Sequence, residues 1–168
     1  RLRVTDRITL PADAPRELRM RLHAGLNPVV VDRGVSLQRL EDDRRGAVPT
    51  TRYRLTLEPG VRDFTLTYAG ELHHPVRELG AAHARSFSVS PGLIAERGVF
   101  LSGVSDWVPA FAGLPRLSFD LSVHLPPGWQ AVSQGTLTEA PAAEAQRAGS
   151  PATVAMRWVE QHPQEEIY

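Results

Sequence analysis

The sequence predicts an all-β fold, an antiparallel β-sandwich with long loops and at most a short helix. The first observation is a regular alternation of apolar and polar residues, which gives a strand one buried face and one solvated face. It occurs in five stretches: residues 18–22, 53–57, 64–68, 117–125 and 154–158. The second observation is the punctuation between these stretches, because 14 prolines and 13 glycines favour many short strands joined by turns.

Turn residues predict how some of these strands connect. A Glu-Pro-Gly sequence at 58–60 predicts a hairpin between the two alternating stretches that flank it. A Pro-Pro-Gly sequence at 126–128 predicts a tight turn that leads into a second strand at Val132 and Ser133. The sequence therefore predicts two local strand pairs, one in each half of the chain.

Two segments lack the alternation. Residues 71–97 contain three histidines and two prolines, and we expect a short helix there over residues 76–84. Residues 139–152 are rich in alanine, glutamate and proline, which predicts a mobile hairpin loop. The whole chain, residues 1–168, is expected to form one domain, because domains usually have about 100–200 residues.

The composition excludes several classes of function. With 19 basic and 19 acidic residues the formal net charge is zero, which argues against nucleic acid as a partner because phosphate binding needs a basic surplus. No apolar run approaches the roughly 18 residues that indicate a membrane span. Cysteine is absent, which excludes disulfides, thiol catalysis and cysteine-ligated zinc.

The composition also bears on origin and location. All the basic residues are arginine, which we interpret mainly as the codon bias of a GC-rich, bacterial genome. The chain begins at Arg1 and not at a methionine. Together with the absence of cysteine, this start favours a bacterial periplasmic or cell-envelope location over the cytoplasm.

Several blocks of the sequence, in order, resemble the amino-terminal β domain of M1-family zinc aminopeptidases. Residues 21–28 and 35–37 resemble its early strands, and residues 53–57 with 64–72 resemble a strand pair that ends in a Tyr-x-Gly turn. The later blocks that carry the resemblance are residues 98–109, 114–135 and 158–168. The resemblance covers most of residues 15–168, and it rests on the ordered series more than on any one motif.

The resemblance implies a saddle-like, non-catalytic domain that packs on a thermolysin-like zinc domain and covers one side of its substrate cleft. The intact protein would then hydrolyse peptides from the amino end with a zinc-bound water as nucleophile. This chain has no His-Glu-x-x-His motif. We therefore expect no metal or cofactor here, zinc in the intact parent protein, and two partners: the chain's own downstream catalytic domain and, in the parent, a peptide substrate.

The resemblance also selects candidate site residues. The family usually supplies a Gln or Glu that holds the substrate's free amine, but the corresponding residues 100–105 contain neither, so that role is assigned to no residue. This departure puts ordinary aminopeptidase specificity in doubt for the parent. The residues expected to face the substrate cleft are Ser102, Gly103, Ser105 and Asp106. The residues expected to form an apolar interdomain patch are Leu101, Trp107, Val108 and Phe111.

Three other motifs suggest a metal site, a serine nucleophile and a binding module. Adjacent residues in a strand point to opposite faces, so His73 and His74 are poorly placed to share a metal ion, and a third ligand such as His83 would have to fold back. Residues 103–107 are similar to a Gly-x-Ser-x-Gly nucleophile elbow, but Trp107 replaces its last glycine. Trp129 suits the main alternative function, a free-standing β-sandwich module that binds carbohydrate or a protein.

Overall fold

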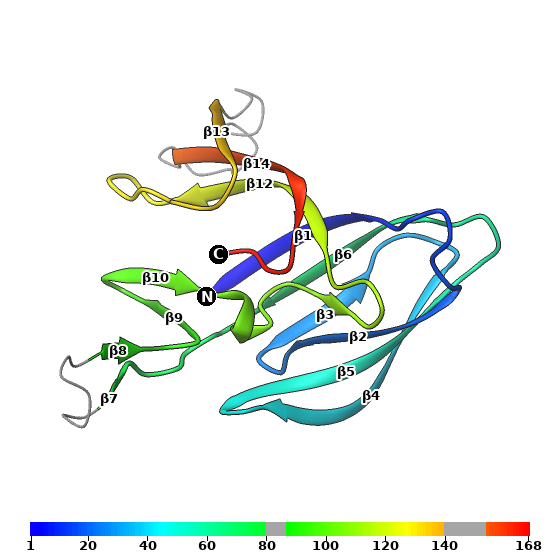
Figure 1. Cartoon of the computed structure of the whole chain (residues 1–168), viewed down its shortest axis with the longest axis horizontal. Coiled ribbons are helices and arrows are strands. Elements are labelled where there is room, and N and C mark those ends of the chain that lie inside the picture. The colour runs from blue at the N-terminus through cyan, green and yellow to red at the C-terminus, as the bar shows by residue number, and fades with distance from the viewer. Residues whose placement is uncertain (80–86, 140–153) are drawn as a thin grey trace. The chain divides into compact units, whose positions relative to one another are not determined.

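The computed structural model describes residues 1–79, 87–139 and 154–168 (Figure 1). Its regular structure is almost entirely antiparallel β-strand, which confirms the predicted all-β, sandwich-like fold. The chain divides into two compact units, unit 1 at Arg1–Pro115 and unit 2 at Arg116–Tyr168. The sequence predicts one domain and does not reveal this division, because no change of composition marks a linker near Pro115.

Unit 1 contains two main antiparallel sheets. The strands that form them are β1 Leu2–Thr9, β2 Glu17–His23, β3 Leu26–Val30, β4 Val35–Arg45, β5 Val48–Leu57, β6 Asp63–Gly70 and β11 Ala110–Phe111. One sheet has the order β1-β6-β3 and the other has the order β11-β2-β5-β4. Strands that are distant in the sequence, such as β1 and β6, are therefore neighbours in space.

The core of unit 1 is built by the apolar positions of β2, β5 and β6. None of the following side chains is more than 5% exposed: Leu18, Met20, Leu22, Tyr53, Leu55, Leu57, Phe64, Leu66 and Tyr68. Complete burial of one large apolar side chain contributes about 1.5–3 kcal/mol. The predicted strands at 18–22, 53–57 and 64–68 are confirmed, and their alternation reflects this burial.

The hairpin predicted at 58–60 is wrong. β5 and β6 belong to different sheets, so the turn carries the chain from one sheet to the other. The turn itself is present, since the amide of Val61 donates to the carbonyl of Glu58 at 3.1 Å and Gly60 has a positive φ of 84°. Turn residues specify a reversal of the chain, whereas the choice of pairing partner depends on which apolar faces the core brings together.

Two short hairpins follow the sheets of unit 1. β7 Arg77–Leu79 pairs with β8 Phe87–Val89, and β9 Gly92–Ala95 pairs with β10 Gly98–Leu101. A single-turn 3₁₀ helix, η1 Gly103–Ser105, comes next. The helix expected at 76–84 is wrong for residues 77–79, which form a strand, and residues 80–84 lie outside the described part of the chain.

Unit 2 is a three-stranded sheet of β12 Leu117–Leu125, β13 Thr136–Glu139 and β14 Val154–Gln164, in the order β12-β14-β13. The predicted strands at 117–125 and 154–158 are confirmed. The second strand after the Pro-Pro-Gly turn begins at Thr136 and not at Val132, and it pairs with β14 instead of β12. The loop expected at 139–152 begins at the last residue of β13 and otherwise falls outside the described residues.

A close approach of two backbones fixes the junction of β3 and β6. Leu26 pairs with Gly70, and a Cβ atom on Gly70 would lie 1.7 Å from the carbonyl oxygen of Gly25. A Cβ atom on Gly25 would in turn lie 2.3 Å from the carbonyl oxygen of Glu71. Neither glycine has a positive φ, so both positions need glycine for space and not for backbone conformation.

One face of β1 is partly buried, and it carries Leu2, Val4, Asp6 and Ile8. Asp6 is therefore a charged residue on an otherwise apolar face. The Tyr68 hydroxyl donates a long hydrogen bond to its carboxylate at 3.4 Å. Burial raises the pKa of Asp6 from 3.8 to about 6, and the hydrogen bond from Tyr68 opposes that rise. Because the folded pKa is the higher one, the charged carboxylate destabilises the fold, and stability is lost as the pH rises from about 4 to about 6.

Replacing Asp6 with asparagine is therefore expected to stabilise unit 1 at pH 8 by about 1–2 kcal/mol, allowing for partial solvent screening. At pH 4 the carboxyl is almost entirely neutral in the folded wild-type protein, so most of the gain should disappear. Urea unfolding at the two pH values measures the difference. The exposed Asp13→Asn variant is the control, and an equal gain from it, or a gain at pH 4 as large as that at pH 8, would show that burial of Asp6 is not the cause.

Candidate functional site

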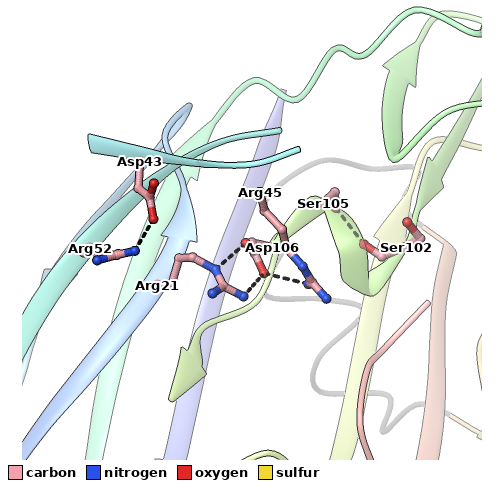
Figure 2. A network of polar contacts seen from close by, with 7 residues as sticks. All are labelled: Arg21, Asp43, Arg45, Arg52, Ser102, Ser105 and Asp106. Atoms are coloured by element: carbon pink, nitrogen blue, oxygen red, sulfur yellow. Dashed lines mark hydrogen bonds and ion pairs between the residues drawn. The ribbon is translucent and has the colours of Figure 1, made fainter. Parts of the chain in front are cut away.

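A buried carboxylate, Asp106, lies at the centre of a cluster of ion pairs and hydrogen bonds in unit 1 (Figure 2). Its side chain is 2% exposed and accepts two hydrogen bonds from Arg21, from Nε at 2.7 Å and from Nη2 at 3.2 Å. Arg45 approaches the same carboxylate, with Nη1 3.4 Å from Oδ1. We call these three residues the Asp106 centre.

The main chain of Asp106 is hydrogen-bonded, as its side chain is. It ends η1 with a left-handed backbone at φ 50°, which aspartate tolerates better than most residues. Its amide donates to the carbonyl of Gly103 at 3.1 Å, and its carbonyl accepts from the amide of His23 at 2.8 Å. Asp106 therefore links η1 to the end of β2 and, through Arg45, to the end of β4.

The charges of the Asp106 centre are matched across strands. The hydrogen bond to Asp106 raises the pKa of Arg21, so the guanidinium of Arg21 stays charged over the physiological range. A second set lies beside it, where Arg52 forms ion pairs with Asp43 and, at 3.1 Å, with Glu41. Arg21 and Arg52 are directly opposite each other in the β2–β5 register, so their two positive charges repel. Asp106 beside Arg21, and Asp43 and Glu41 beside Arg52, offset this repulsion.

Two serine hydroxyls fix the turn that precedes Asp106. Ser102 donates to the carbonyl of Pro91 at 2.6 Å, and Ser105 donates to the carbonyl of Ser102 at 2.7 Å. Ser105 is 0% exposed and packs against Gly92, where an added Cβ would meet the Ser105 Cβ at 3.0 Å. A buried hydroxyl that donates to a carbonyl oxygen, in an all-β setting, has neither the base nor the access of a serine nucleophile.

The residues expected to face a substrate cleft divide into two kinds. Ser105 and Asp106 are buried and hold the turn together, whereas Ser102 and Gly103 are half-buried. Their placement in a cleft stays a prediction. The structure adds that the Ser105 and Asp106 side chains are engaged by residues of unit 1 itself.

The residues expected in an apolar interdomain patch also differ in exposure. Trp107 is 6% exposed, so it does not contribute to an exposed patch. Leu101, Val108 and Phe111 are half-buried. The exposed apolar side chains of this segment are Val99, Phe100 and Val104, with Phe100 the most exposed at 54%.

A pair of histidines lies next to the Asp106 centre. The Nε2 atoms of His23 and His74 are 3.0 Å apart, and the ring centres are 5.2 Å apart with the planes at 80°. The rings therefore meet almost head-on, as in an N–H···N hydrogen bond, and are not turned toward a common ion. Burial and the neighbouring His74 lower the pKa of His23 to about 4, against an opposing effect of Asp106.

Metal binding finds no support in this geometry. The Nε2 atom of His74 contacts Nε2 of His23, and His83 lies outside the described residues. Within residues 1–79, 87–139 and 154–168, no three His, Asp or Glu side chains converge as a metal site would require. In the same part of the chain, no helix has the length and apolarity needed to cross a membrane.

Trp129, the candidate residue for stacking on a sugar, has only part of its surface exposed. Trp129 is half-buried, and its amide closes the Pro-Pro-Gly turn by donating to the carbonyl of Pro126 at 3.2 Å. A stacking platform for a sugar needs an open aromatic face. The position of Trp129 thus gives no particular support to a carbohydrate-binding function.

The residues that make up the site were mostly missed by sequence reasoning. Arg21, His23 and Arg45 were not selected, because they meet Asp106 only after folding, across up to 85 positions of sequence. One signal was available: the alternation of β2 places Arg21 and His23 on the same, polar face.

Comparison of the chain with protein-family models, with curated proteins and with solved structures finds no match to any of them. The interpretation of its function therefore rests on its own residues and geometry.

Proposed function

We propose that this chain is the non-catalytic amino-terminal domain of an M1-like zinc metallopeptidase. In the proposed assembly it packs on a downstream catalytic domain of the same polypeptide and covers one side of the substrate cleft. The intact protein would release residues from the amino end of peptides. The proposal combines the ordered resemblance along the sequence with the sandwich-like, all-β fold.

One observation supports the proposal most strongly. The residues that are expected to face the cleft lie in residues 98–109, a segment that is held by the strands of unit 1. The Asp106 centre anchors this segment, and β11, which directly follows it, pairs with β2 through Ala110 and Phe111. Binding segments are commonly irregular stretches held by a rigid sheet.

The same segment exposes apolar side chains. Val99 and Phe100 on β10 and Val104 on η1 are all more than 40% exposed, and Phe100 is the most exposed of the three. Because Val99 and Phe100 are adjacent in a strand, they point to opposite faces, so we assign the interdomain contact first to the larger side chain, Phe100. The half-buried residues Leu101, Val108 and Phe111 stay in the proposed contact, and buried Trp107 does not.

Zinc would not belong to this chain. The described residues offer no convergent set of metal ligands, and the sequence has no cysteine and no His-Glu-x-x-His motif. Zinc bound in the downstream domain would supply the activated water that attacks the peptide bond. The part of the present chain would be to shape the cleft, with Ser102 and Gly103 as the half-buried residues nearest its rim.

The test compares residues 1–168 with the product of the whole gene. The whole protein is expected to contain one zinc ion per chain and to hydrolyse aminoacyl-p-nitroanilides, and residues 1–168 are expected to do neither. Metal analysis and a chromogenic assay measure both properties. Stoichiometric zinc in residues 1–168, or turnover by it, would overturn the proposal, as would a whole protein with neither property.

Replacing Phe100 with serine tests the interdomain contact. In the whole protein this change is expected to cost about 2 kcal/mol of stability, because a buried phenyl ring is lost. In residues 1–168 alone it should change stability by less than about 0.5 kcal/mol. The matched control is Val29→Ser on β3, also an exposed apolar residue, which should have little effect in either protein. Equal effects of Phe100→Ser in both proteins would argue against the contact.

A further inference from the structure

β1 lies at one edge of the sheet β1-β6-β3, and among the described residues no strand pairs with its other side. All eight of its residues pair with β6 in one unbroken register, from Leu2 opposite Gly70 to Thr9 opposite Asp63. Successive residues of a strand direct their backbone groups to alternate sides, so every second amide and carbonyl of β1 points away from β6. These groups form a regular row to which one more strand could bond.

The other edges of the two main sheets are less suited to accept a strand. β3 contains Pro28, which has no amide hydrogen, and β11 has only two residues. The pairing of β4 with β5 is shifted between Arg39 and Asp42, an irregularity of the kind that protects sheet edges. β1 has neither a proline nor a shift of register. It is therefore the edge at which addition of a strand is least hindered.

The inward face of β1 leaves apolar surface uncovered. Val4 and Ile8 are half-buried, whereas Tyr68 and Phe64, which lie opposite them on β6, are each only 3% exposed. Burial thus decreases across this face from β6 to β1. A strand beside β1 would remove more of this surface from water, and it would gain most if its own inward residues were apolar.

The outward face of β1 is basic. Arg3 and Arg7 are exposed on it, and the residues opposite them on β6 are the uncharged Ala69 and Thr65. No ion pair among the described residues involves either arginine. A strand added to β1 would place one residue directly opposite each arginine, and acidic side chains are favoured at those two positions.

A second copy of this chain is a poor occupant of the edge. In a two-fold symmetric pairing of two β1 strands, residues of the same face lie opposite each other. The two longest such pairings are centred on Thr5 and on Asp6. The first places Arg3 of each copy opposite Arg7 of the other, and the second places the two Asp6 carboxylates opposite each other. Like charges directly opposite are destabilising, so both pairings are disfavoured.

Asp6 restricts the occupant further. It lies on the inward face of β1 between Val4 and Ile8, and an inward charge on an edge strand is one way in which proteins prevent unselective strand addition. An apolar residue opposite Asp6 would remove water from the carboxylate without replacing its hydrogen bonds. A hydroxyl side chain in that position can donate to it. The edge therefore favours a particular pattern of residues over a merely apolar strand.

We propose that the free edge of β1 binds an extended peptide segment with two acidic residues four positions apart, which adds as an antiparallel fourth strand to the sheet β1-β6-β3. The acidic residues lie opposite Arg3 and Arg7, a hydroxyl residue lies opposite Asp6, and apolar residues lie opposite the rest of the inward face. The proposal is independent of the peptidase assignment, because every residue that carries it belongs to unit 1.

The probe is the capped peptide Val-Glu-Thr-Thr-Val-Glu-Val, which has this pattern for antiparallel pairing with residues 2–8, and the control peptide has lysine in place of both glutamates. Amide hydrogen exchange of the 168-residue chain, followed by NMR, locates binding. Every second amide of β1 should exchange rapidly in the free chain and slowly with the glutamate peptide. The lysine peptide should bind at least about tenfold more weakly. Slow exchange of these amides without peptide, protection at a different edge, no binding at millimolar concentration, or equal binding of both peptides would overturn the proposal.

Reversing the charges of β1 separates strand addition from general charge attraction. The double variant Arg3→Glu with Arg7→Glu should bind the lysine peptide at least about tenfold more tightly than the glutamate peptide. The matched control is Arg33→Glu with Arg44→Glu, which alters two other exposed arginines of unit 1 and changes the net charge equally. This control should keep the wild-type preference. Far-ultraviolet circular dichroism checks that both variants fold. A reversed preference in the control, or an unchanged one in the β1 variant, would show that β1 is not the binding edge.

Discussion

Replacing Gly70 with alanine is expected to prevent stable folding of unit 1. The new Cβ atom would lie 1.7 Å from the carbonyl oxygen of Gly25, and the obstacle is backbone, not a flexible side chain. Relief would require β3 and β6 to separate where Leu26 pairs with Gly70, which would also disturb the fully buried Leu26 side chain. We expect a loss of at least about 3 kcal/mol, a large part of the stability of a typical domain.

The matched control for Gly70 is Gly98, at the start of β10. It has no positive φ, and nothing lies within 4 Å of its hypothetical Cβ atom. Gly98→Ala should therefore be neutral or slightly stabilising, because alanine restricts the unfolded chain more than glycine does. Far-ultraviolet circular dichroism and urea unfolding distinguish the two variants. A Gly70→Ala protein as stable as Gly98→Ala would mean that β3 and β6 do not approach as described.

Replacing Asp106 with alanine is expected to cost about 3 kcal/mol. Removal of one partner of a buried ion pair typically costs 3–5 kcal/mol, and the lower end applies because both arginines reach solvent. Alanine also tolerates the left-handed backbone of residue 106 less well than aspartate. Asp106→Asn keeps the shape and the backbone preference, so we expect a smaller loss from it.

Two precautions make the Asp106 measurement specific. Unfolding is best followed by the fluorescence of Trp107, in a background with Trp129 and Trp158 replaced by phenylalanine, because those two residues belong to unit 2. The control is Asp13→Ala, at an exposed aspartate of unit 1, which should change stability by less than about 0.5 kcal/mol. If Asp106→Ala proves no more harmful than Asp13→Ala, the Asp106 centre does not anchor the segment.

The sequence predicted those parts of the fold that depend on local alternation. β2, β5 and β6 were foreseen because one face of each strand is buried in the core, which leaves a period of two in the sequence. β1 was missed because Asp6 occupies one of its inward positions and breaks the apolar pattern.

Strand pairing could not be predicted in the same way. The sequences at 58–60 and 126–128 both form turns, yet neither joins strands that pair with each other. Pairing depends on contacts between residues far apart in the sequence, and turn residues carry no information about those contacts.

The candidate site was foreseen only in its location along the chain. The resemblance selected residues 101–111, and Asp106 within them proved to be the centre of the polar cluster. Its partners come from β2 and β4, and the alternation of those strands shows only that Arg21 and Arg45 avoid the core. Exposure within the segment was also unpredictable, since the burial of Trp107 depends on packing that sequence does not encode locally.

The measurement that tests the account most directly is to read the coding sequence beyond the codon for Tyr168. The account predicts that the reading frame continues into a His-Glu-x-x-His motif with a later glutamate ligand, the zinc site that the present chain lacks. A frame that ends, or continues without that motif, would contradict the peptidase proposal and leave the chain as a β-sandwich module with another role.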